Sequence, residues 1–137
     1  MVDRQKLSNR LNALEDYLTE IRALAALPRE KFIREPSFHH LAERYLHLAC
    51  EAVLDMANHV ISEEGFRQPG TNEESITVLE EEGILSPGLA ERLRRWMGFR
   101  NVLVHLYLEI DHGRVYDAMT EDLEDLEEFA SRISAFL

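Results

Sequence analysis

The chain has 137 residues, of which 45% are hydrophobic and 30% charged, a balance typical of one globular domain spanning residues 1–137. Its single cysteine, Cys50, excludes an internal disulfide framework and a cysteine metal cluster, and we expect it to be a small buried apolar residue. No apolar stretch approaches the roughly 20 residues that span a bilayer. The polar start does not resemble a signal peptide, so we expect a cytoplasmic protein with no membrane partner.

The net charge of −11 is unevenly distributed. Residues 109–128 contain nine acids and one base, which sum to −8, whereas residues 91–105 contain four arginines and one acid, which sum to +3. The overall acidity opposes general nucleic-acid binding, because phosphate contacts need cations. A local arginine cluster is nevertheless compatible with holding a phosphate, and the acidic side is suited to docking a basic partner.

The first part of the chain predicts two long helices. Leucine and isoleucine recur at alternating spacings of four and three residues, which indicates a helix over residues 2–26 that ends before Pro28. Residues 31–36 are predicted to be a linker. With Ser37 as its N-cap, the second helix should run to about Gly65. Its apolar positions are Leu41, Tyr45, Leu48, Ala52, Met56 and Val60.

A short helix and another main helix follow. After a loop at residues 66–70, residues 71–74 have the form of a capping box, with Thr71 as the cap, and predict a short helix that ends at Gly83. Ser86 and Pro87 are typical of an N-cap and a first helical position. The helix that they begin should carry Leu89, Leu93, Trp96, Met97, Arg100, Val104 and, at its furthest, Tyr107.

The C-terminal part predicts one last helix. Residues 111–113 are predicted to form a turn, and residues 114–118 a short irregular segment. Residues 120–122 should begin the helix, because acids at a helix N-terminus interact favourably with its dipole. No sustained alternation of apolar and polar residues predicts a strand. The economical fold is all-α, an up-and-down bundle of four to five helices.

Residues 100–107 contain the residue types that RNA cleavage without a metal requires. A base must remove the proton of the ribose 2′-hydroxyl, and an acid must protonate the leaving 5′-oxygen. Histidine suits proton transfer near neutral pH, and the guanidinium fork of arginine matches two phosphate oxygens and stabilises the charge that develops on them. Arg100 and His105 are therefore the candidate catalytic residues, and Asn101 is a candidate supporting residue.

The spacing within this segment leaves two interpretations open. On a regular helix Arg100 and His105 lie about 140° apart and flank a groove, while Tyr107 lies near the face of Arg100 and Asn101 near that of His105. The alternative is structural: a surface arginine, a histidine bonded to a backbone carbonyl and a tyrosine partly in the core. Because a single histidine must fill both the acid and the base role, a dimer that pairs two such helices would supply the second one.

The run from Trp96 to Tyr107 resembles the signature of the HepT-like ribonuclease toxins of the HEPN superfamily. That signature is Arg, four residues, His, one residue and Tyr, usually with Asn after the Arg. All four positions match. Residues 44–59, the turn at 111–116 and the acidic last helix are also similar, so the resemblance covers essentially the whole chain. The matching signature residues are Arg100, Asn101, His105 and Tyr107.

This resemblance implies an RNA endonuclease toxin of a type VII toxin–antitoxin module, built as an all-helical homodimer with a composite cleft between two signature helices. Arg100 and His105 would be its core residues. It also implies a partner, an antitoxin resembling a minimal nucleotidyltransferase, which transfers AMP from ATP to the signature tyrosine, here Tyr107. An AMP group there would place a phosphodiester beside Arg100, neutralise the cation and fill the cleft.

Other residues are candidates for supporting roles. Glu51, in the middle of the second helix, is placed to orient Arg100 or His105 across the bundle, or is an exposed helix acid. Three more arginines extend the RNA-binding surface or belong to a solvated helix face. They are Arg92, Arg94 and Arg95.

Neither a metal nor a cofactor is expected. The histidines outside the signature lack the spacing of a metal site, and ordinary surface or core roles are favoured for them. No glycine-rich phosphate loop is present in the sequence, so the chain has no ATP-binding motif of its own. The histidines considered are His39, His40, His47 and His59.

Three hypotheses therefore stand. The first is a ribonuclease toxin. The second is a non-catalytic helical binding partner or acceptor subunit of a nucleotidyltransferase, with Tyr107 as the acceptor. The third is a purely structural helical dimer, which is favoured if Arg100 and His105 point into separate buried hydrogen bonds.

Overall fold

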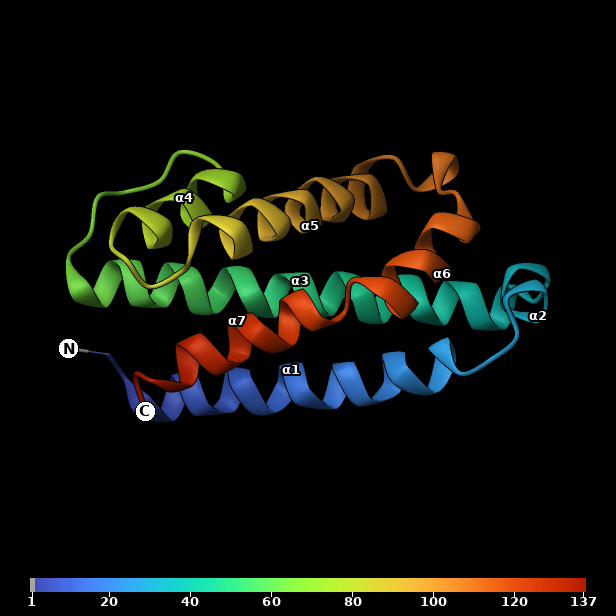
Figure 1. The fold of residues 1–137 in the computed structure, drawn as a ribbon, viewed down its shortest axis with the longest axis horizontal. Coiled ribbons are helices and arrows are strands. Elements are labelled where there is room, and N and C mark those ends of the chain that lie inside the picture. Colours follow the sequence, from blue (N-terminus) through green and yellow to red (C-terminus); the bar gives the residue numbers. More distant parts are fainter. Residues whose placement is uncertain (1) are drawn as a thin grey trace.

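The structure is a computed structural model that describes residues 2–137. Within them it contains seven α-helices, one 3-10 turn and no strand. The four main helices are α1 (Arg4–Ala25), α3 (Pro36–Glu64), α5 (Pro87–His105) and α7 (Glu124–Ser134), and they run alternately in opposite directions (Figure 1). The predicted all-α, up-and-down bundle is confirmed, with three short helices that raise the total above the four to five expected.

The short elements connect the main helices. α2 (Arg29–Arg34) and α6 (His112–Glu121) lie at one end of the bundle, and α4 (Asn72–Glu81) lies beside α5 (Figure 1). The 3-10 turn η1 (Tyr107–Glu109) joins α5 to α6. α1 packs along α3, while α4 and α5 pack on α3 from another side. None of the helices in residues 2–137 combines the length and hydropathy that a membrane span needs.

α1 follows directly from its sequence pattern. The Asp3 carboxylate accepts hydrogen bonds from the backbone N–H groups of Gln5 and Lys6, both at 3.1 Å, and so begins the helix. The leucine and isoleucine positions at spacings of four and three face α3 and are buried. They are Leu7, Leu11, Leu14, Leu18 and Ile21.

Two predictions for the next segment are wrong. Residues 31–36 are not a linker throughout, because α2 begins after Pro28 and buries Phe32 completely. The helix is only six residues long, which is too short to show a period in the sequence. Ser37 is not the N-cap of α3 either. The N-cap is Glu35, two residues earlier, and the helix begins at Pro36, whose fixed φ suits the first helical position.

The predicted caps of α4 and α5 are confirmed. The Thr71 hydroxyl accepts a hydrogen bond from the Glu74 backbone N–H at 3.1 Å, and the Ser86 hydroxyl accepts one from the Leu89 N–H at 3.2 Å. Gly83, just after α4, has a φ of 76°, the left-handed conformation that favours glycine at a helix end.

The C-terminal elements differ from the prediction. Residues 111–118 do not form a turn and an irregular segment, because the Asp111 carboxylate caps a regular helix by accepting from the Gly113 and Arg114 N–H groups. Thr120 lies inside this helix, and its hydroxyl donates to the Tyr116 carbonyl. The last helix therefore begins at Glu124 and not at residues 120–122.

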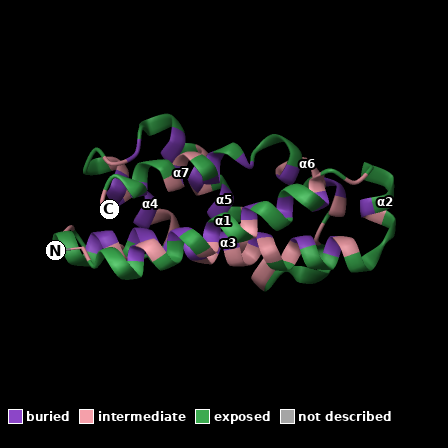
Figure 2. Ribbon diagram, turned by 90° about the horizontal axis from the view of Figure 1, so that it is seen from below, coloured by how far each residue is buried: buried purple, intermediate pink, exposed green. Residues whose placement is uncertain are grey.

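One continuous hydrophobic core fills the bundle, and the buried positions form stripes along each main helix (Figure 2). Cys50 is fully buried as predicted, and burial raises the pKa of its thiol to about 12. A buried polar cluster joins two of the main helices. The Asp125 carboxylate accepts from the Trp96 indole N–H at 3.1 Å and from Arg92 at 2.8 Å, which fastens α7 to α5.

Candidate functional site

Arg100 lies on the inner face of α5. It follows the buried Leu93 by seven residues, which is two helical turns, so its side chain points toward α3 and is only 17% exposed. There its Nε–H donates to the Glu51 carboxylate at 2.6 Å. Arg100 is therefore held by a charge-assisted hydrogen bond between two main helices. Of the two roles considered for Glu51, the structure shows contact with Arg100.

The pair belongs to a wider polar network. Arg100 Nη1 donates to the Asn101 side-chain carbonyl at 3.2 Å, and the Asn101 amide lies 3.5 Å from a carboxylate oxygen of Glu73 on α4. On α3, His47 Nε2 lies 3.5 Å from the same Glu51 oxygen. No hydrogen bond to Nη2 of Arg100 occurs within residues 2–137, so one edge of the guanidinium is available to an anion.

His105 and Tyr107 have the opposite character. His105 is the last residue of α5 and is exposed, and within the described chain its side chain makes no hydrogen bond or ion pair. Tyr107 is 66% exposed. It lies between Leu106 and Leu108, which are 47% and 89% exposed. The end of α5 thus presents a histidine and a phenol to solvent beside an uncovered apolar turn.

Tyr107 is not on the helix of Arg100, so the expectation that the two side chains share a helical face is wrong. α5 ends at His105, and Leu106 leaves helical geometry with φ −122° and ψ 38°. The next residues, 106–109, are exposed, and the chain packs on the core again only from Ile110. Val102 and Val104 add to the effect, because β-branched residues lose rotamer freedom in a helix.

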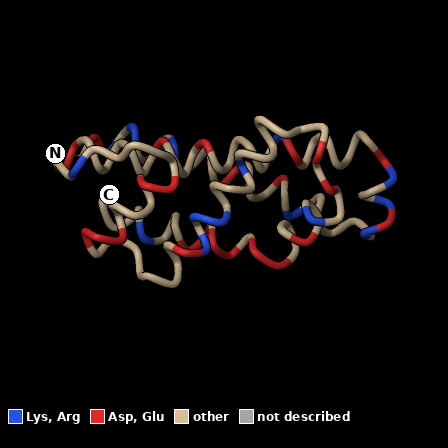
Figure 3. The backbone as a smooth tube through the Cα atoms, turned by 90° about the horizontal axis from the view of Figure 1, so that it is seen from above, with Lys and Arg blue, Asp and Glu red and all other residues tan. Residues whose placement is uncertain are grey.

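The three further arginines of α5 are all paired with carboxylates. Arg92 donates to Asp125 and Glu128 on α7, and Arg94 donates to Glu80 on α4 at 2.9 Å. Arg95 contacts only Glu91 on its own helix, and its side chain is 72% exposed. Figure 3 shows the Lys and Arg positions interspersed with the Asp and Glu positions along the backbone. Arg95 is therefore the most accessible of the three cations.

Arg92 and Arg95 line a groove of about 280 Å³ between α5 and the α6–α7 segment. Trp96 and Phe99 form its apolar wall, and Arg114 contributes a third cation. Arg94 lies on the other side of α5, against α4, together with Asn101. The groove is electrically balanced, because three acids also line it. They are Asp117, Asp122 and Asp125.

A family model described as ribonuclease HepT-like matches residues 14–133 of this chain. The chain belongs to the HepT-like ribonuclease family. The mRNA nuclease HepT of Shewanella oneidensis is 32% identical over 90 residues, which cover 66% of this chain and 68% of that protein. The tRNA nuclease HepT of Aphanizomenon flos-aquae is 27% identical over 131 residues, 96% of this chain and 89% of that protein.

A solved structure shows the same fold in a complex. It is a tri-AMPylated HEPN toxin of Shewanella oneidensis bound to an MNT antitoxin, with a TM-score of 0.88 and 25% identity, covering 94% of this chain and 96% of that one. The predicted family is thereby confirmed. HepT nucleases are its homologues, and its structural neighbours are toxin–antitoxin complexes.

Within this HepT-like chain, the residues around Glu51 extend the predicted site. Arg44 Nη1 lies 3.4 Å from His47 Nδ1, and His47 in turn contacts Glu51. The sequence pattern connected Glu51 with the signature but not Arg44 or His47. The available signal was their spacing, since residues three and four apart share one face of a helix. Only the tertiary packing of α3 on α5 shows that this face meets Arg100.

The ion pair between Glu51 and Arg100 should be measurable as an energetic coupling. Glu51→Ala and Arg100→Ala each leave a half-buried charge without its partner, so the double variant should lose less stability than the sum of the two, by about 1–2 kcal/mol. Urea unfolding of the four proteins gives the coupling. The exposed pair Glu91 and Arg95 is the matched control and should couple more weakly. Additive effects at Glu51 and Arg100 would contradict the geometry described above.

Proposed function

We propose that this chain is a metal-independent RNA endonuclease and the toxin of a toxin–antitoxin pair, with Arg100 and His105 as its catalytic residues. The observation that carries the proposal is the contrast at the end of α5. Arg100 is fixed by Glu51 with one edge free, and an exposed, unpaired His105 follows within the same signature. In a HepT-like chain this arrangement provides a preorganised cation and a mobile proton carrier.

Arg100 supplies the electrostatic part of the reaction. Its Nε and Nη1 groups are occupied by Glu51 and Asn101, so Nη2 is the edge that meets a non-bridging phosphate oxygen. Because the guanidinium is already fixed, little reorganisation is needed as negative charge develops on the phosphorus centre. Glu51 and Asn101 are positioning residues in this scheme, since they act through Arg100.

His105 supplies the proton transfers. A neutral imidazole removes the proton of the 2′-hydroxyl, whose oxygen forms a bond to phosphorus as the bond to the 5′-oxygen breaks. The 5′-oxygen takes up a proton, and the products are a 2′,3′-cyclic phosphate and a 5′-hydroxyl. One imidazole cannot be base and acid at the same instant, so a second copy of His105 is proposed to serve as the acid.

A second copy of the chain is proposed to cover the apolar turn. Leu106, Tyr107 and Leu108 are exposed together directly after His105, and large apolar side chains gathered in this way are typical of an interaction surface. A dimer formed there places two signature helices near each other. RNA contacts extend from Arg95, which is the most exposed of the three arginines, while Arg92 and Arg94 would first have to exchange carboxylate partners for phosphates.

Tyr107 is proposed as the control point. Its side chain is 66% exposed on a turn outside the helix, so a nucleotidyltransferase antitoxin can reach the hydroxyl without unfolding α5. Attack of that oxygen on the α-phosphorus of ATP forms a phosphodiester and releases pyrophosphate. The resulting anion and nucleoside would occupy the space that the RNA backbone needs. The similar toxin in complex with an MNT antitoxin is tri-AMPylated, which supports this assignment.

His105→Ala should lower RNA cleavage by about 10²–10⁴-fold, because a proton-transfer group typically contributes that much. Cleavage of total RNA in the presence of a chelator, followed by analysis for 2′,3′-cyclic phosphate ends, measures it. His59→Ala, far along α3, is the matched control and should cleave like the unsubstituted chain. Full activity in the His105 variant, or a strict need for a divalent metal, would sink the proposal.

Tyr107→Phe should cleave RNA but resist AMP transfer, because it lacks the acceptor oxygen. Incubation with ATP and the neighbouring nucleotidyltransferase, followed by intact-mass measurement and an RNA assay, tests this. Tyr45→Phe is the control and should gain AMP and lose cleavage like the unsubstituted protein. If the unsubstituted protein gains AMP but does not cleave RNA even before AMP transfer, the acceptor-subunit alternative would be favoured.

Leu108→Glu should convert the dimer to a monomer and reduce cleavage in parallel, because it places a charge in the proposed apolar interface. Sedimentation equilibrium and the RNA assay measure the two effects. Leu137→Glu changes another exposed leucine, at the far end of the bundle, and should alter neither. A monomeric unsubstituted chain with full activity would remove the need for a shared site.

A further inference from the structure

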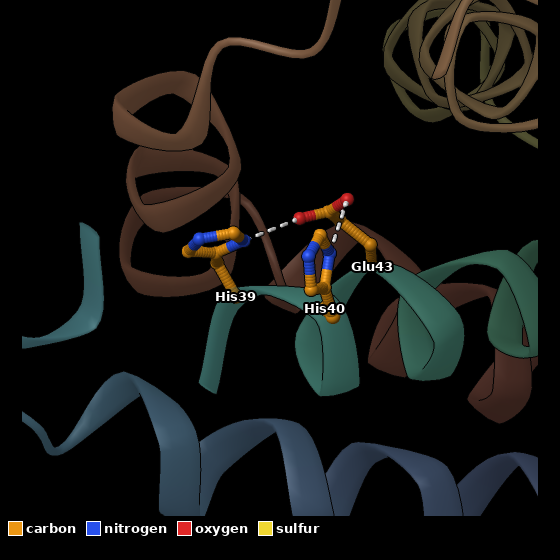
Figure 4. Close-up of side chains that lie close together, drawn as sticks. All are labelled: His39, His40 and Glu43. Atoms are coloured by element: carbon orange, nitrogen blue, oxygen red, sulfur yellow. Dashed lines mark hydrogen bonds and ion pairs between the residues drawn. The ribbon is translucent and has the colours of Figure 1, made fainter. Parts of the chain in front are cut away.

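A second group of chemically active side chains lies away from the signature, where the first turns of α3 and α6 meet. His39, His40 and Glu43 come from α3, and His112 is the first residue of α6. Figure 4 shows His39 and His40 approaching the two oxygens of the Glu43 carboxylate from different sides. Three imidazoles therefore surround one carboxylate.

The distances among these groups are those of a metal-ligand cage. His39 Nδ1 lies 3.2 Å and His112 Nδ1 3.3 Å from the same Glu43 oxygen, and His40 Nδ1 lies 3.7 Å from the other oxygen. In a tetrahedral zinc site, bonds of about 2.0–2.1 Å place neighbouring ligand atoms about 3.3 Å apart. The donor atoms of His39, His40 and Glu43 all lie within 4.8 Å of one another.

The hydrogen bonds present do not account for all of these atoms. His112 Nδ1 is buried and, within residues 2–137, has no hydrogen-bond partner, although it lies beside the Glu43 carboxylate. A buried polar nitrogen without a partner is costly, and such atoms call for a ligand. A cation between Nδ1 and the carboxylate would satisfy both groups at once.

The charge at the centre of the cluster also suits a metal. The Glu43 carboxylate lies among the three imidazoles and lowers the cost of placing a cation there. The next charges are of both signs, because the Arg29 guanidinium and the Asp111 carboxylate lie against Gly113, the residue after His112.

We propose that His39, Glu43 and His112, with His40 as the exposed fourth ligand, form a binding site for a divalent transition metal of the Zn²⁺ class. Nitrogen-rich, four-ligand sets of this composition are typical of zinc and not of magnesium or calcium, which prefer oxygen. His39 and His112 are stacked with ring centroids 3.7 Å apart, and the rings must turn apart when the metal enters the plane of each. His40, at 68% exposed, is free to turn inward.

The metal would have a structural role. It joins the N-terminal turn of α3 to that of α6, and α6 begins three residues after the turn that carries Tyr107. Glu43 lies eight residues from Glu51 along α3, about 12 Å by helical rise, so the metal does not reach the Arg100 contact. The inference is thus independent of the proposed ribonuclease mechanism, which is expected to proceed in chelator.

Calorimetric titration of the chelator-treated, tag-free protein with Zn²⁺ tests the site. One saturable site is expected, with little binding of Mg²⁺, and Co²⁺ in its place should give the intense visible absorption of tetrahedral coordination. Glu43→Gln and His112→Ala should each weaken Zn²⁺ binding by about 100-fold or more, since loss of an outer-shell partner alone costs 10–100-fold. Zn²⁺ should also raise the melting temperature of the unsubstituted chain and not of these variants.

His59→Ala is the control, because this histidine lies at the other end of α3 and contacts the backbone of Asp3. It should bind Zn²⁺ like the unsubstituted protein. His40→Ala changes only an exposed side chain. Its Zn²⁺ affinity is a second test of the site if circular dichroism shows that either of the other two variants fails to fold. Absence of a saturable Zn²⁺ site in the unsubstituted protein would overturn the assignment. So would a Zn²⁺ affinity in all three cluster variants equal to that of the unsubstituted protein.

Discussion

The packing of α3 at the centre of the bundle is the constraint on which the positions of the other helices depend. Every other α-helix of residues 2–137 packs against it, and small residues such as Ala49 and Ala57 let its neighbours approach closely. A polar side chain that a neighbouring helix covers loses part of its contact with water, so a partner on that helix stabilises it. Glu51 accepts a hydrogen bond from Arg100 on α5, and the buried Ser75 of α4 donates to Asn58 of α3. The candidate catalytic arginine is thus positioned by the requirement that a polar group covered by another helix finds a hydrogen-bond partner.

Local sequence signals predicted the parts of the fold that depend on local energetics. The leucine seam of α1 and the caps at Thr71 and Ser86 are each decided within a few residues, so they could be read directly. α2 and α6 could not be read in this way, because they are short and owe their stability to burying Phe32 and Tyr116 against each other at the end of the bundle. Tertiary contact, which a single sequence does not show, decides such elements.

The candidate site likewise has parts that the sequence predicted and parts that depend on tertiary packing. The signature residues were found from their resemblance to the HepT-like signature, because spacing alone left a structural interpretation open. Their different environments depend on where α5 extends beyond the surface of the bundle. Arg100 is five residues before the exposed end of α5 and is paired with Glu51 on α3, whereas His105 is the last helical residue and its side chain is exposed. The pairing of Arg92 and Arg94 with carboxylates could likewise not be predicted from the sequence, since their partners lie on α7 and α4, far away in sequence.

This division suits the chemistry proposed. A cation that stabilises a transition state works best when it is already oriented, because reorganising it during the reaction costs energy. A proton carrier must instead reach both the attacking and the leaving oxygen, which a fully packed imidazole could not do. A fixed Arg100 followed five residues later by an exposed, unpaired His105 meets both requirements, provided that water is excluded when RNA binds. The exposed turn after His105 offers a surface that a second chain could cover, which would exclude water from the site. The same turn carries Tyr107, where a single added phosphodiester would prevent RNA from binding.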